Sequence, residues 1–400
     1  MTLAFKGGPR VRSQDFPAWP QFDATEEQAL MRSLHQGQWW RVSGKENTSF
    51  EAEFAEQHGA PHAVTVTNGT VALEIALQAA GIRPGDEIIV PAFTFISTSM
   101  ACQRVGAVAV PADVLPDSYC IDPAAVRKKI TARTRALIPV HMSGHFCDMT
   151  ALHAIADEHA LVIIQDAAHA NGARGEAGKR VGEWNTLACF SFQNFKLMTA
   201  GEGGLVLCPT QELRDLVFLY SNCGRPAGDR AYNHTVVGSN GRMNEFTAAV
   251  LRAQLARLDT QTAIREANAQ LLTQALSEDP RISVQSHTAL ATLHPHYMYM
   301  LTLTQAAGAA SIDRNHFVDC LAAEGIPVNR SYQAIYRIPS FWLTPAPAAT
   351  ADQLIAECPV TEHIAGRGAW IHHRALLGSP DDTLDIARGI TKVLNALASA

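Results

Sequence analysis

Lys196 is the residue whose setting first suggests chemistry, because it lies in a mainly apolar stretch, SFQNFKLMTAGEGG, over residues 191–204. An ammonium group that is buried without a partner loses several kcal/mol of solvation, and its pKa then falls until a neutral, nucleophilic amine remains. Such an amine forms imines with carbonyl compounds. The alternative is a lysine whose stem packs on apolar neighbours while its head reaches water, and composition alone favours that alternative for a single lysine.

Asp166 is a second candidate, at the end of the aliphatic run in LVIIQDAAHANG, residues 161–172. A carboxylate in that position is partly buried, so it needs a cation or several hydrogen-bond donors. A helix cap or a structural ion pair would satisfy a single aspartate equally well. His169, three residues further on, could hold a ligand oxygen or a backbone carbonyl.

The third candidate is the turn of Thr67, Asn68, Gly69 and Thr70, where the strand-like run AVTVT meets a helical pattern. Free amides at a helix N-terminus carry about half a positive charge and bind phosphate, and a glycine lets the backbone approach the ligand closely. An ordinary cap with a tight turn explains the same residues.

Together these three places supply what pyridoxal 5'-phosphate (PLP) requires from a protein. The cofactor needs a phosphate cradle, an acid that pairs with its protonated pyridine nitrogen, and a lysine that forms an imine with its aldehyde. The turn at 67–70, Asp166 and Lys196 occur in the order expected along one sheet. Phe93, which follows another strand-like run, could stack on the cofactor ring, although a core position accounts for it as well.

Parallel strands joined by helices are expected to position these residues. From about residue 60, short apolar runs alternate with helical patterns, which is typical of an α/β fold with a parallel sheet. Ligands bind such sheets where the strands end, so polar residues after the apolar runs belong to one site. The strand-like runs lie at residues 63–67, 87–93, 136–140 and 161–164, and the helical patterns at 71–81, 97–106 and 149–160.

The length of 400 residues exceeds what one hydrophobic core usually supports, so we expect two domains. A proline-free helical stretch at 243–276 is the expected connector. We place a large PLP-binding domain with an N-terminal arm at 1–258 and a smaller domain at 259–400. The smaller domain is expected to contain a strand at 298–303, a helix at 317–325 and a last helix that begins at Ser379-Pro380.

The composition argues against several classes of protein. The net charge is -6, without a run of five like charges, which excludes an electrostatic footprint for nucleic acid. Apolar runs stay below the roughly 20 residues that span a bilayer, so we expect no membrane partner and a cytoplasmic protein. The eight cysteines form no C-x-x-C pair and lie partly in apolar segments, so we expect reduced packing residues and no metal site.

Five segments, taken in their order and spacing, resemble one family: TNGTVALEIAL, PAFTFISTS, QDAAHA, SFQNFKLMTAGEGG and GSNGRMNEF. They are similar to the DegT/DnrJ/EryC1/StrS family of PLP enzymes, and the likeness covers nearly the whole chain. The resemblance implies an α/β fold of PLP fold type I, like that of aspartate aminotransferase. A mostly parallel seven-stranded sheet then forms the large domain, and a smaller α/β domain follows at the C-terminus.

The resemblance also assigns cofactor-binding residues. It implies that Lys196 is the Schiff-base lysine and the catalytic residue, that Asp166 pairs with the pyridine nitrogen, and that His169 lies near the ring hydroxyl. Asn240 would reach the phosphate of the neighbouring subunit's cofactor, which implies a homodimer with active sites at the subunit interface. The other implied contacts are ring stacking by Phe93 and phosphate binding by Gly69, Thr70 and Ser191.

Further segments resemble one group within that family, the 3-amino-5-hydroxybenzoate (AHBA) synthases of antibiotic biosynthesis; they are FPAWPQFD, GQWWR, FSFQN-x-KLMTAGEGG, CGRP, NEF-x-A-x-VLRAQLARLD, HYM-x-M, AIYR and WIHHR. This resemblance implies dehydration and aromatisation of a small molecule, 5-amino-5-deoxy-3-dehydroshikimate, with Lys196 as the base that removes a proton beside the imine. Polar residues in the shared segments are candidate substrate contacts, and an arginine is a natural partner for the substrate carboxylate. They are Arg242, His296, Tyr297, Tyr336, Arg337 and His372.

Phe195 separates this chain from those synthases, in which a glycine precedes the lysine. A large ring there would reshape the pocket, so the alternative function is an L-glutamine-dependent aminotransferase that acts on a cyclitol (inosose) or a nucleotide ketosugar. A non-catalytic PLP-binding or regulatory protein is a third hypothesis, although the cofactor residues are intact and no helix-turn-helix is appended. Lys196 itself argues against the sugar 3-dehydratases of the family, which carry histidine in its place.

Overall fold

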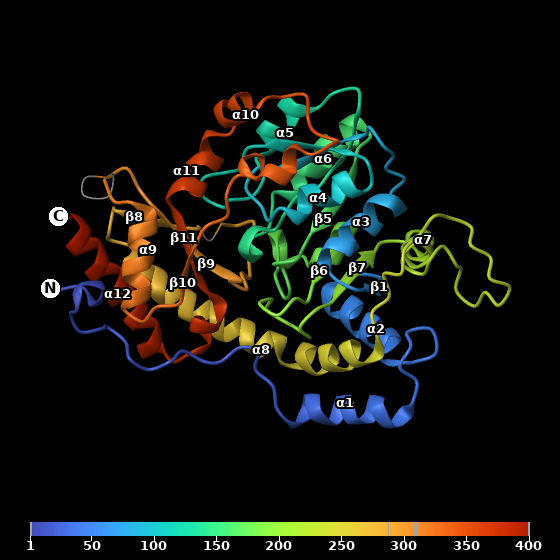
Figure 1. The fold of residues 1–400 in the computed structure, drawn as a ribbon, viewed down its shortest axis with the longest axis horizontal. Coiled ribbons are helices and arrows are strands. Elements are labelled where there is room, and N and C mark those ends of the chain that lie inside the picture. The colour runs from blue at the N-terminus through green and yellow to red at the C-terminus, as the bar shows by residue number, and fades with distance from the viewer. Residues whose placement is uncertain (1, 287, 307–310, 399–400) are drawn as a thin grey trace.

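The computed structural model describes residues 2–286, 288–306 and 311–398, and its larger sheet has seven strands (Figure 1). Across this sheet the strands are β1 (His62–Val66), β7 (Gly204–Cys208), β6 (Leu187–Ser191), β5 (Val162–Asp166), β4 (Thr134–Leu137), β2 (Glu87–Pro91) and β3 (Val108–Ala112). β7 runs antiparallel to both β1 and β6, whereas the remaining pairs are parallel. The α/β fold with a mostly parallel seven-stranded sheet, expected from the sequence, is therefore confirmed.

Helices cover both faces of the large sheet, because successive strand residues point to opposite faces. In β2, Ile88 and Val90 join one core cluster and Ile89 joins the other. The first cluster lies under α3 (Gly69–Ala79), α4 (Ser97–Arg104) and α7 (Gln211–Ser221), and the second under α2 (Glu46–His58), α5 (Pro123–Lys129) and α6 (Met149–His159). α3 is apolar nearly all round and is mostly buried, as its sequence predicts.

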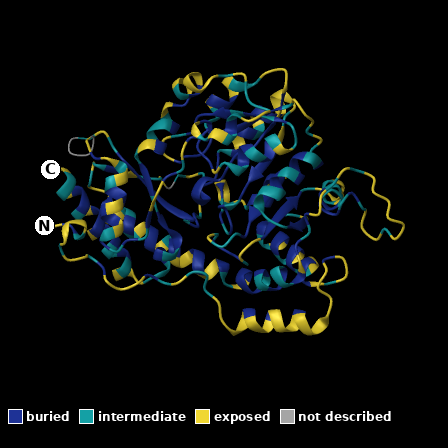
Figure 2. Cartoon of the chain, in the orientation of Figure 1, coloured by how far each residue is buried: buried dark blue, intermediate teal, exposed yellow. Residues whose placement is uncertain are grey.

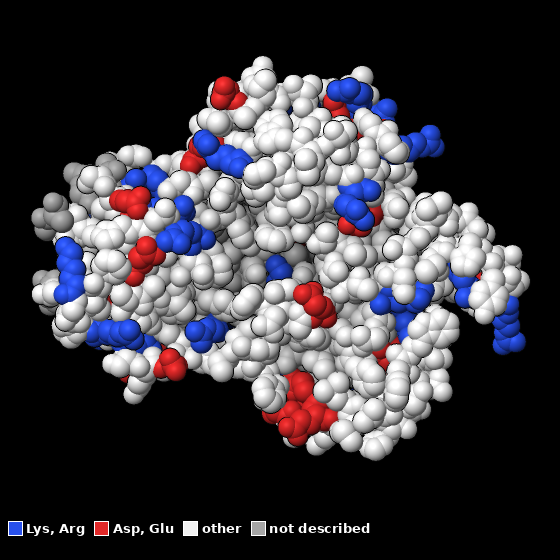
Figure 3. All heavy atoms as spheres, in the orientation of Figure 1, with Lys and Arg blue, Asp and Glu red and all other residues white. Residues whose placement is uncertain are grey.

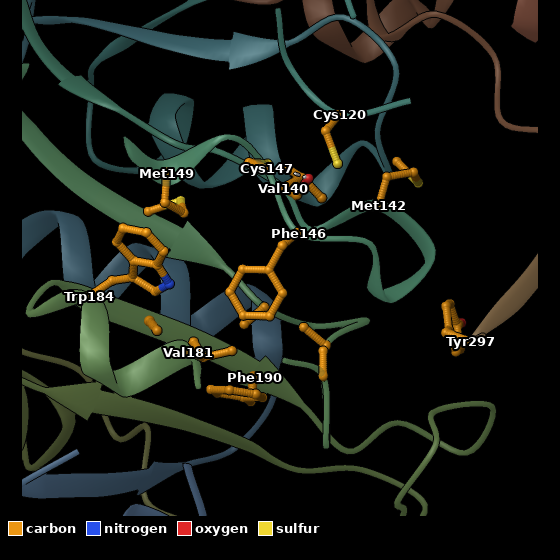
Figure 4. Packing of buried hydrophobic residues seen from close by; sticks show 14 of the residues in the cluster. Cys120, Val140, Met142, Phe146, Cys147, Met149, Val181, Trp184, Phe190 and Tyr297 are labelled. Atoms are coloured by element: carbon orange, nitrogen blue, oxygen red, sulfur yellow. Dashed lines mark hydrogen bonds between the residues drawn. The ribbon is translucent and has the colours of Figure 1, made fainter. Parts of the chain in front are cut away.

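The core beneath α2, α5 and α6 contains large aromatic side chains. Figure 4 shows Phe146, Trp184 and Phe190 packed in this cluster, with Tyr297 at its edge. Cys120 and Cys147 lie in the same cluster. All eight cysteines are free thiols, and seven of them are buried, which agrees with the expectation of reduced packing residues.

α8 (Glu245–Leu276) is the long helix expected as a connector, and it contacts both parts of the molecule. Arg252 pairs with Glu53 of α2 across 2.6 Å, and Asn268 donates a hydrogen bond to Leu376 O across 2.9 Å. α1 (Ala24–Gln36) packs on the same helix from outside (Figure 1). The expected domain boundary after residue 258 falls inside α8 and stays a prediction.

The second sheet is antiparallel, with the order β10 (Val328–Arg330), β11 (Gly368–His372), β9 (Met298–Leu303) and β8 (Ile282–Val284). Its apolar side chains share a core with α9 (Arg314–Ala323) and α12 (Pro380–Ala398). The cap expected at Ser379 is present, because Asp382 N donates to Ser379 Oγ across 3.2 Å. The remaining helices in the described residues are α10 (Ala351–Glu357), α11 (Pro359–Arg367) and the 3-10 turns Ala4–Lys6, Met142–Gly144, Glu176–Gly178, Val181–Trp184, Ile335–Arg337, Pro339–Trp342 and His373–Leu377.

Two features are absent from the described part of the chain: a membrane-spanning helix and a cluster of metal ligands. None of the helices within residues 2–286, 288–306 and 311–398 combines the length and the apolar content that crossing a lipid bilayer requires. The same residues contain no group of three or more His, Cys, Asp or Glu side chains arranged to hold a metal ion.

Candidate active site

A cavity of about 740 Å³ lies where the strands of the large sheet end. Asp166 ends β5, Ser191 ends β6, and residues 68–71 follow β1; all of them line this cavity. The second sheet supplies further lining residues, among them Asn329 of β10 and His372 of β11. Figure 3 shows a hollow between the two parts of the molecule, with a basic group at its floor.

Lys196 lies on the loop between β6 and β7 and lines the cavity. Its Nζ is 4.4 Å from the ring centroid of Tyr297, which is a cation–π distance. Among the described residues that line the cavity, Lys196 is the only lysine or arginine. Leu197 is buried, whereas Phe195 on the other side is 54% exposed and lines the cavity as well. The amine is therefore placed to react with a carbonyl group held in the cavity.

Asp166 is a buried carboxylate with two hydrogen-bond donors. Thr98 Oγ1 donates to Asp166 Oδ2 across 2.9 Å, and Ala168 N donates to Oδ1 across 3.2 Å. Burial raises the pKa of the Asp166 carboxyl, while these two bonds and the charge of Lys196 oppose the rise. A cationic partner inside the cavity, such as a protonated pyridine nitrogen, would stabilise the ionised form.

His169 is a buried, neutral imidazole beside the same cavity. Its Nδ1 accepts a hydrogen bond from Ser143 N across 3.3 Å, so the other nitrogen, Nε2, carries the proton. The ring stacks on Tyr297 with the centroids 4.3 Å apart. Burial, together with the charge of Lys196, lowers the pKa of His169 well below its usual value. His169 can therefore donate one hydrogen bond to a ligand oxygen at neutral pH.

The N-terminus of α3 forms one end of the cavity. Asn68 caps the helix by accepting a hydrogen bond from Val71 N across 2.9 Å. A Cβ atom on Gly69 would lie only 2.7 Å from Ser191 Cβ, so this position requires glycine. Thr70 Oγ1 donates to Ser97 Oγ across 2.9 Å. Amides and hydroxyls gathered at a helix N-terminus are the donors that a phosphate group needs, so the residues present fit PLP.

Six of the eight residues predicted to bind the cofactor line this cavity: Gly69, Thr70, Asp166, His169, Ser191 and Lys196. Their individual roles in binding stay predictions.

Phe93 and Asn240 lie elsewhere. Contrary to the expectation, Phe93 does not line the cavity; it is fully buried, with its ring 6.2 Å from those of Tyr119 and Tyr332. Phe95, two residues further on, is 51% exposed and does line it. The two rings differ because the chain turns after β2 and sends Phe93 into the core. Asn240 is exposed on the long connection between α7 and α8, and its proposed contact with a second subunit stays a prediction.

Two of the six candidate substrate contacts, Tyr297 and His372, line the cavity. Burial lowers the pKa of His372 to about 4, so this ring is neutral at pH 7. The other four do not line the cavity, and each has contacts elsewhere in the chain. Arg242 bonds to Asn222, His296 pairs with Glu266, Arg337 pairs with Glu362, and Tyr336 is buried in the core.

Sequence reasoning missed several lining residues. Thr98 could have been predicted from the sequence, since the segment FTFISTS places hydroxyl groups directly after a strand. Phe95 lay in the same segment, but nothing in the local pattern distinguished it from Phe93. Tyr332 and Trp370 could not have been predicted from the sequence, because only the packing of the second sheet against the first brings them to the cavity.

Comparison with known proteins places this site in a family. The model of the DegT/DnrJ/EryC1/StrS aminotransferase family matches residues 21–390. The 3-amino-5-hydroxybenzoate synthase of Amycolatopsis mediterranei strain S699 is 50% identical over 373 residues, which are 92% of this chain and 95% of that protein. The L-glutamine:2-deoxy-scyllo-inosose aminotransferase of Streptomyces lividus is 35% identical over an alignment of 416 residues, with 98% of this chain and 97% of that protein covered.

A solved structure agrees with these matches. The crystal structure of 3-amino-5-hydroxybenzoic acid (AHBA) synthase superposes with a TM-score of 0.92 at 48% identity, covering 96% of this chain and 100% of that chain. The chain therefore belongs to the DegT/DnrJ/EryC1/StrS aminotransferase family and is a PLP-dependent enzyme.

Proposed function

We propose that this enzyme dehydrates and aromatises 5-amino-5-deoxy-3-dehydroshikimate to 3-amino-5-hydroxybenzoate, as a step in the biosynthesis of a secondary metabolite. The observation that carries the proposal is the 50% identity to an AHBA synthase over 92% of the chain. The aminotransferase relative reaches only 35% over a similar span.

The polar residues that line the cavity suggest one orientation for PLP. We propose that the α3 N-terminus with Thr70 and Ser191 binds the phosphate and that Asp166 holds the proton on the pyridine nitrogen. His169 then donates a hydrogen bond from Nε2 to the ring hydroxyl. Bound in this way, PLP supplies an electron sink for negative charge that develops beside the substrate nitrogen.

Lys196 moves the protons of the reaction. Its Nζ removes the proton from the ring carbon that carries the amino group, and it returns a proton to the hydroxyl that leaves the neighbouring carbon, so one water is released. His169 and His372 stay neutral at pH 7, so neither supplies that proton. Loss of a second ring proton and protonation of the ketone oxygen then complete the aromatic ring.

Aromatic side chains around the cavity suit a flat product. Phe95, Phe195, Tyr297, Tyr332 and Trp370 all line it. Their rings exclude water and offer apolar surface to a planar ring. We propose that Phe95, and not Phe93, is the aromatic residue that faces the cofactor.

We further propose that two copies form a homodimer that completes the site. A cofactor phosphate and a substrate carboxylate need cations, and Lys196 is the only one among the described lining residues of one chain. α1 turns buried Ala29 and Ser33 toward α8 and leaves Leu30, Met31 and Leu34 exposed (Figure 2). Exposed apolar groups in such number mark an interface, and a second copy is the partner we expect.

Two further expectations remain proposals. We propose a large domain at residues 1–258 and a smaller domain at 259–400, supported by the two separate sheets. We also propose a cytoplasmic location, supported by the free thiol state of all eight cysteines.

The experiment that tests the reaction is incubation of the PLP-loaded enzyme with 5-amino-5-deoxy-3-dehydroshikimate. We expect a new aromatic absorbance and a product that has lost one water. We expect Lys196→Ala to lower the rate by about 10²- to 10⁴-fold, the usual contribution of a positioned proton carrier, and to lose the pyridoxyl group that borohydride reduction otherwise leaves on residue 196. No product from this substrate would contradict the proposal.

A second candidate function is amino transfer from L-glutamine to a cyclitol ketone. The inosose aminotransferase relatives and the exposed ring of Phe195 in the cavity favour it. Turnover of an inosose with glutamine, without turnover of the aminodehydroshikimate, would select this candidate.

A further inference from the structure

The loop that carries Lys196 is held from outside at two backbone carbonyls. Trp19 Nε1 donates to Asn194 O across 2.9 Å, and His373 Nε2 bonds to Phe195 O across 2.9 Å. These carbonyls belong to the two residues directly before Lys196, and residues 192–203 form no helix or strand of their own. The two partners come from opposite ends of the chain, so the geometry of the loop depends on contacts outside its own sequence.

His373 is suited to hold a carbonyl in place. A carbonyl oxygen only accepts hydrogen bonds, so Nε2 carries the proton and Nδ1 carries the lone pair. The ring is fully buried, and Trp19 packs edge to face against it at 4.5 Å. Burial, with the charge of Arg265, lowers the pKa of His373 well below its usual value. The imidazole therefore stays neutral and keeps one tautomer.

The His373 ring also lies beside Tyr297, the aromatic residue that contacts the side-chain nitrogen of Lys196. The centroids of His373 and Tyr297 are 6.1 Å apart, with the ring planes 29° from parallel. Lys196 Nζ is 4.4 Å from the centroid of Tyr297. His373 itself does not line the cavity, so it acts on the lysine through residues such as Phe195 and Tyr297.

We propose that His373, supported by Trp19, is a positioning residue that sets the direction of Lys196 in the cavity. The hydrogen bond fixes the peptide plane between Phe195 and Lys196, and this plane sets the direction in which the lysine side chain leaves the backbone. Without it the loop can rotate, and the amine meets the cofactor aldehyde less often in a reactive geometry. This inference rests on the proposed function only in taking Lys196 as the residue that binds PLP.

The test follows PLP uptake by the full-length apo-protein in the absence of any substrate. His373→Leu removes the donor, and His373→Gln returns an N–H group close to the position of Nε2. Trp19→Phe keeps an aromatic ring and removes the indole donor. His153→Leu is the matched control, because His153 is a half-buried histidine that stacks on Trp184 and does not contact the loop.

We expect His373→Leu to slow the covalent attachment of PLP to Lys196, followed as growth of its visible absorption, by about tenfold, the size expected for one buried hydrogen bond. His373→Gln should recover most of that rate, Trp19→Phe should show a smaller loss, and His153→Leu should match the parent. The pH midpoint of the absorption should move in His373→Leu and return in His373→Gln.

Uptake at the parental rate and an unchanged pH midpoint in His373→Leu would overturn the proposal. A His373→Gln protein as slow as His373→Leu would do the same, because packing and not the donor would then explain the loss. Circular dichroism shows whether His373→Leu is folded. If it is unfolded, the other two variants decide: PLP uptake at the parental rate in His373→Gln and slower uptake in Trp19→Phe support the proposal. Uptake at the parental rate in Trp19→Phe contradicts it. An enzyme that shows these differences but does not convert the aminodehydroshikimate contradicts the proposed function alone.

Discussion

Thr98 donates a hydrogen bond from Oγ1 to Oδ2 of Asp166 across 2.9 Å, at a place where both side chains are buried. Burial favours the protonated acid, and the hydroxyl favours the carboxylate. Because pairing with a protonated pyridine nitrogen needs the carboxylate, an uncharged threonine tunes the charge of the cofactor site.

We expect Thr98→Val to weaken PLP binding by about tenfold to a hundredfold, because a hydrogen bond to a charged group contributes about 1.5–3 kcal/mol. Titration of the apo-protein with PLP, read by absorption, measures the change. Thr273→Val is the control, because it removes a hydroxyl contact of the same length, 2.9 Å to Tyr299 Oη, at a residue that does not line the cavity. Equal affinities in Thr98→Val and the parent would contradict the prediction.

Gly69→Ala should damage the phosphate end of the cavity. The new Cβ would lie 2.7 Å from Ser191 Cβ, so α3 or β6 must shift, at a cost of about 1–3 kcal/mol in the free energy of unfolding. We expect PLP affinity to fall by at least about fivefold, the equivalent of the smaller of those energies. The control is Gly366→Ala, because a Cβ there meets no atom within 4 Å. Urea unfolding and PLP titration of both variants measure the free energy of unfolding and the PLP affinity. Values equal to those of the parent for Gly69→Ala would contradict the close contact with Ser191.

Phe195→Ala tests the aromatic ring that lines the cavity directly before Lys196 in the chain. The ring meets His372 edge-on at 5.7 Å and is 54% exposed, so its removal should change the free energy of unfolding by less than about 1 kcal/mol. We expect the KM for the aminodehydroshikimate to rise several-fold while kcat changes less, because the ring contributes binding surface and no reacting group.

The matched control for Phe195→Ala is Phe5→Ala. Phe5 is 53% exposed and packs edge-on against His316 at 5.4 Å, outside the cavity. Steady-state kinetics with the aminodehydroshikimate and with an inosose plus glutamine would show which substrate Phe195 favours. A kcat that falls more than KM rises would place the ring closer to the reaction than we infer.

Buried histidines should make the apo-protein sensitive to acid. Burial lowers the pKa of His58, His141 and His372 to about 4 and lowers that of His169 and His373 well below the usual value. As the pH falls from 6.5 toward 4, the unfolded chain binds protons that the folded chain does not. The free energy of unfolding therefore decreases, by about 1.4 kcal/mol for each pKa unit of each group.

Urea unfolding of the apo-protein at several pH values between 8 and 5 measures this slope. His58→Gln isolates one group outside the cavity, whose Nδ1 bonds to Phe54 O across 3.0 Å. We expect His58→Gln to have a lower free energy of unfolding than the parent at pH 8. We also expect its free energy of unfolding to depend less on pH, because up to one proton fewer is taken up on unfolding. A slope equal to that of the parent would show that His58 is protonated equally in both states.

Much of the site could be predicted because its parts are local. Asp166 and Lys196 stand out as polar residues at the ends of apolar runs, and Gly69 lies at the turn where a strand becomes a helix. Carboxyl ends of parallel strands meet at one edge of a sheet, so order along the chain was enough to place them in one cavity. The cap at Ser379 and the length of α8 follow in the same way from neighbouring residues.

The tertiary structure alone decided which similar residues face the cavity. Phe93 and Phe95 carry the same side chain two positions apart, and only the turn after β2 buries one and exposes the other. His373 and Trp19 reach the lysine loop across 178 and 175 positions of the chain. Local sequence patterns determine helices, strands and the residues at their ends, because these depend on backbone and side-chain preferences within a few residues. Contacts between distant segments depend on how whole layers pack, and no short stretch of sequence contains that information.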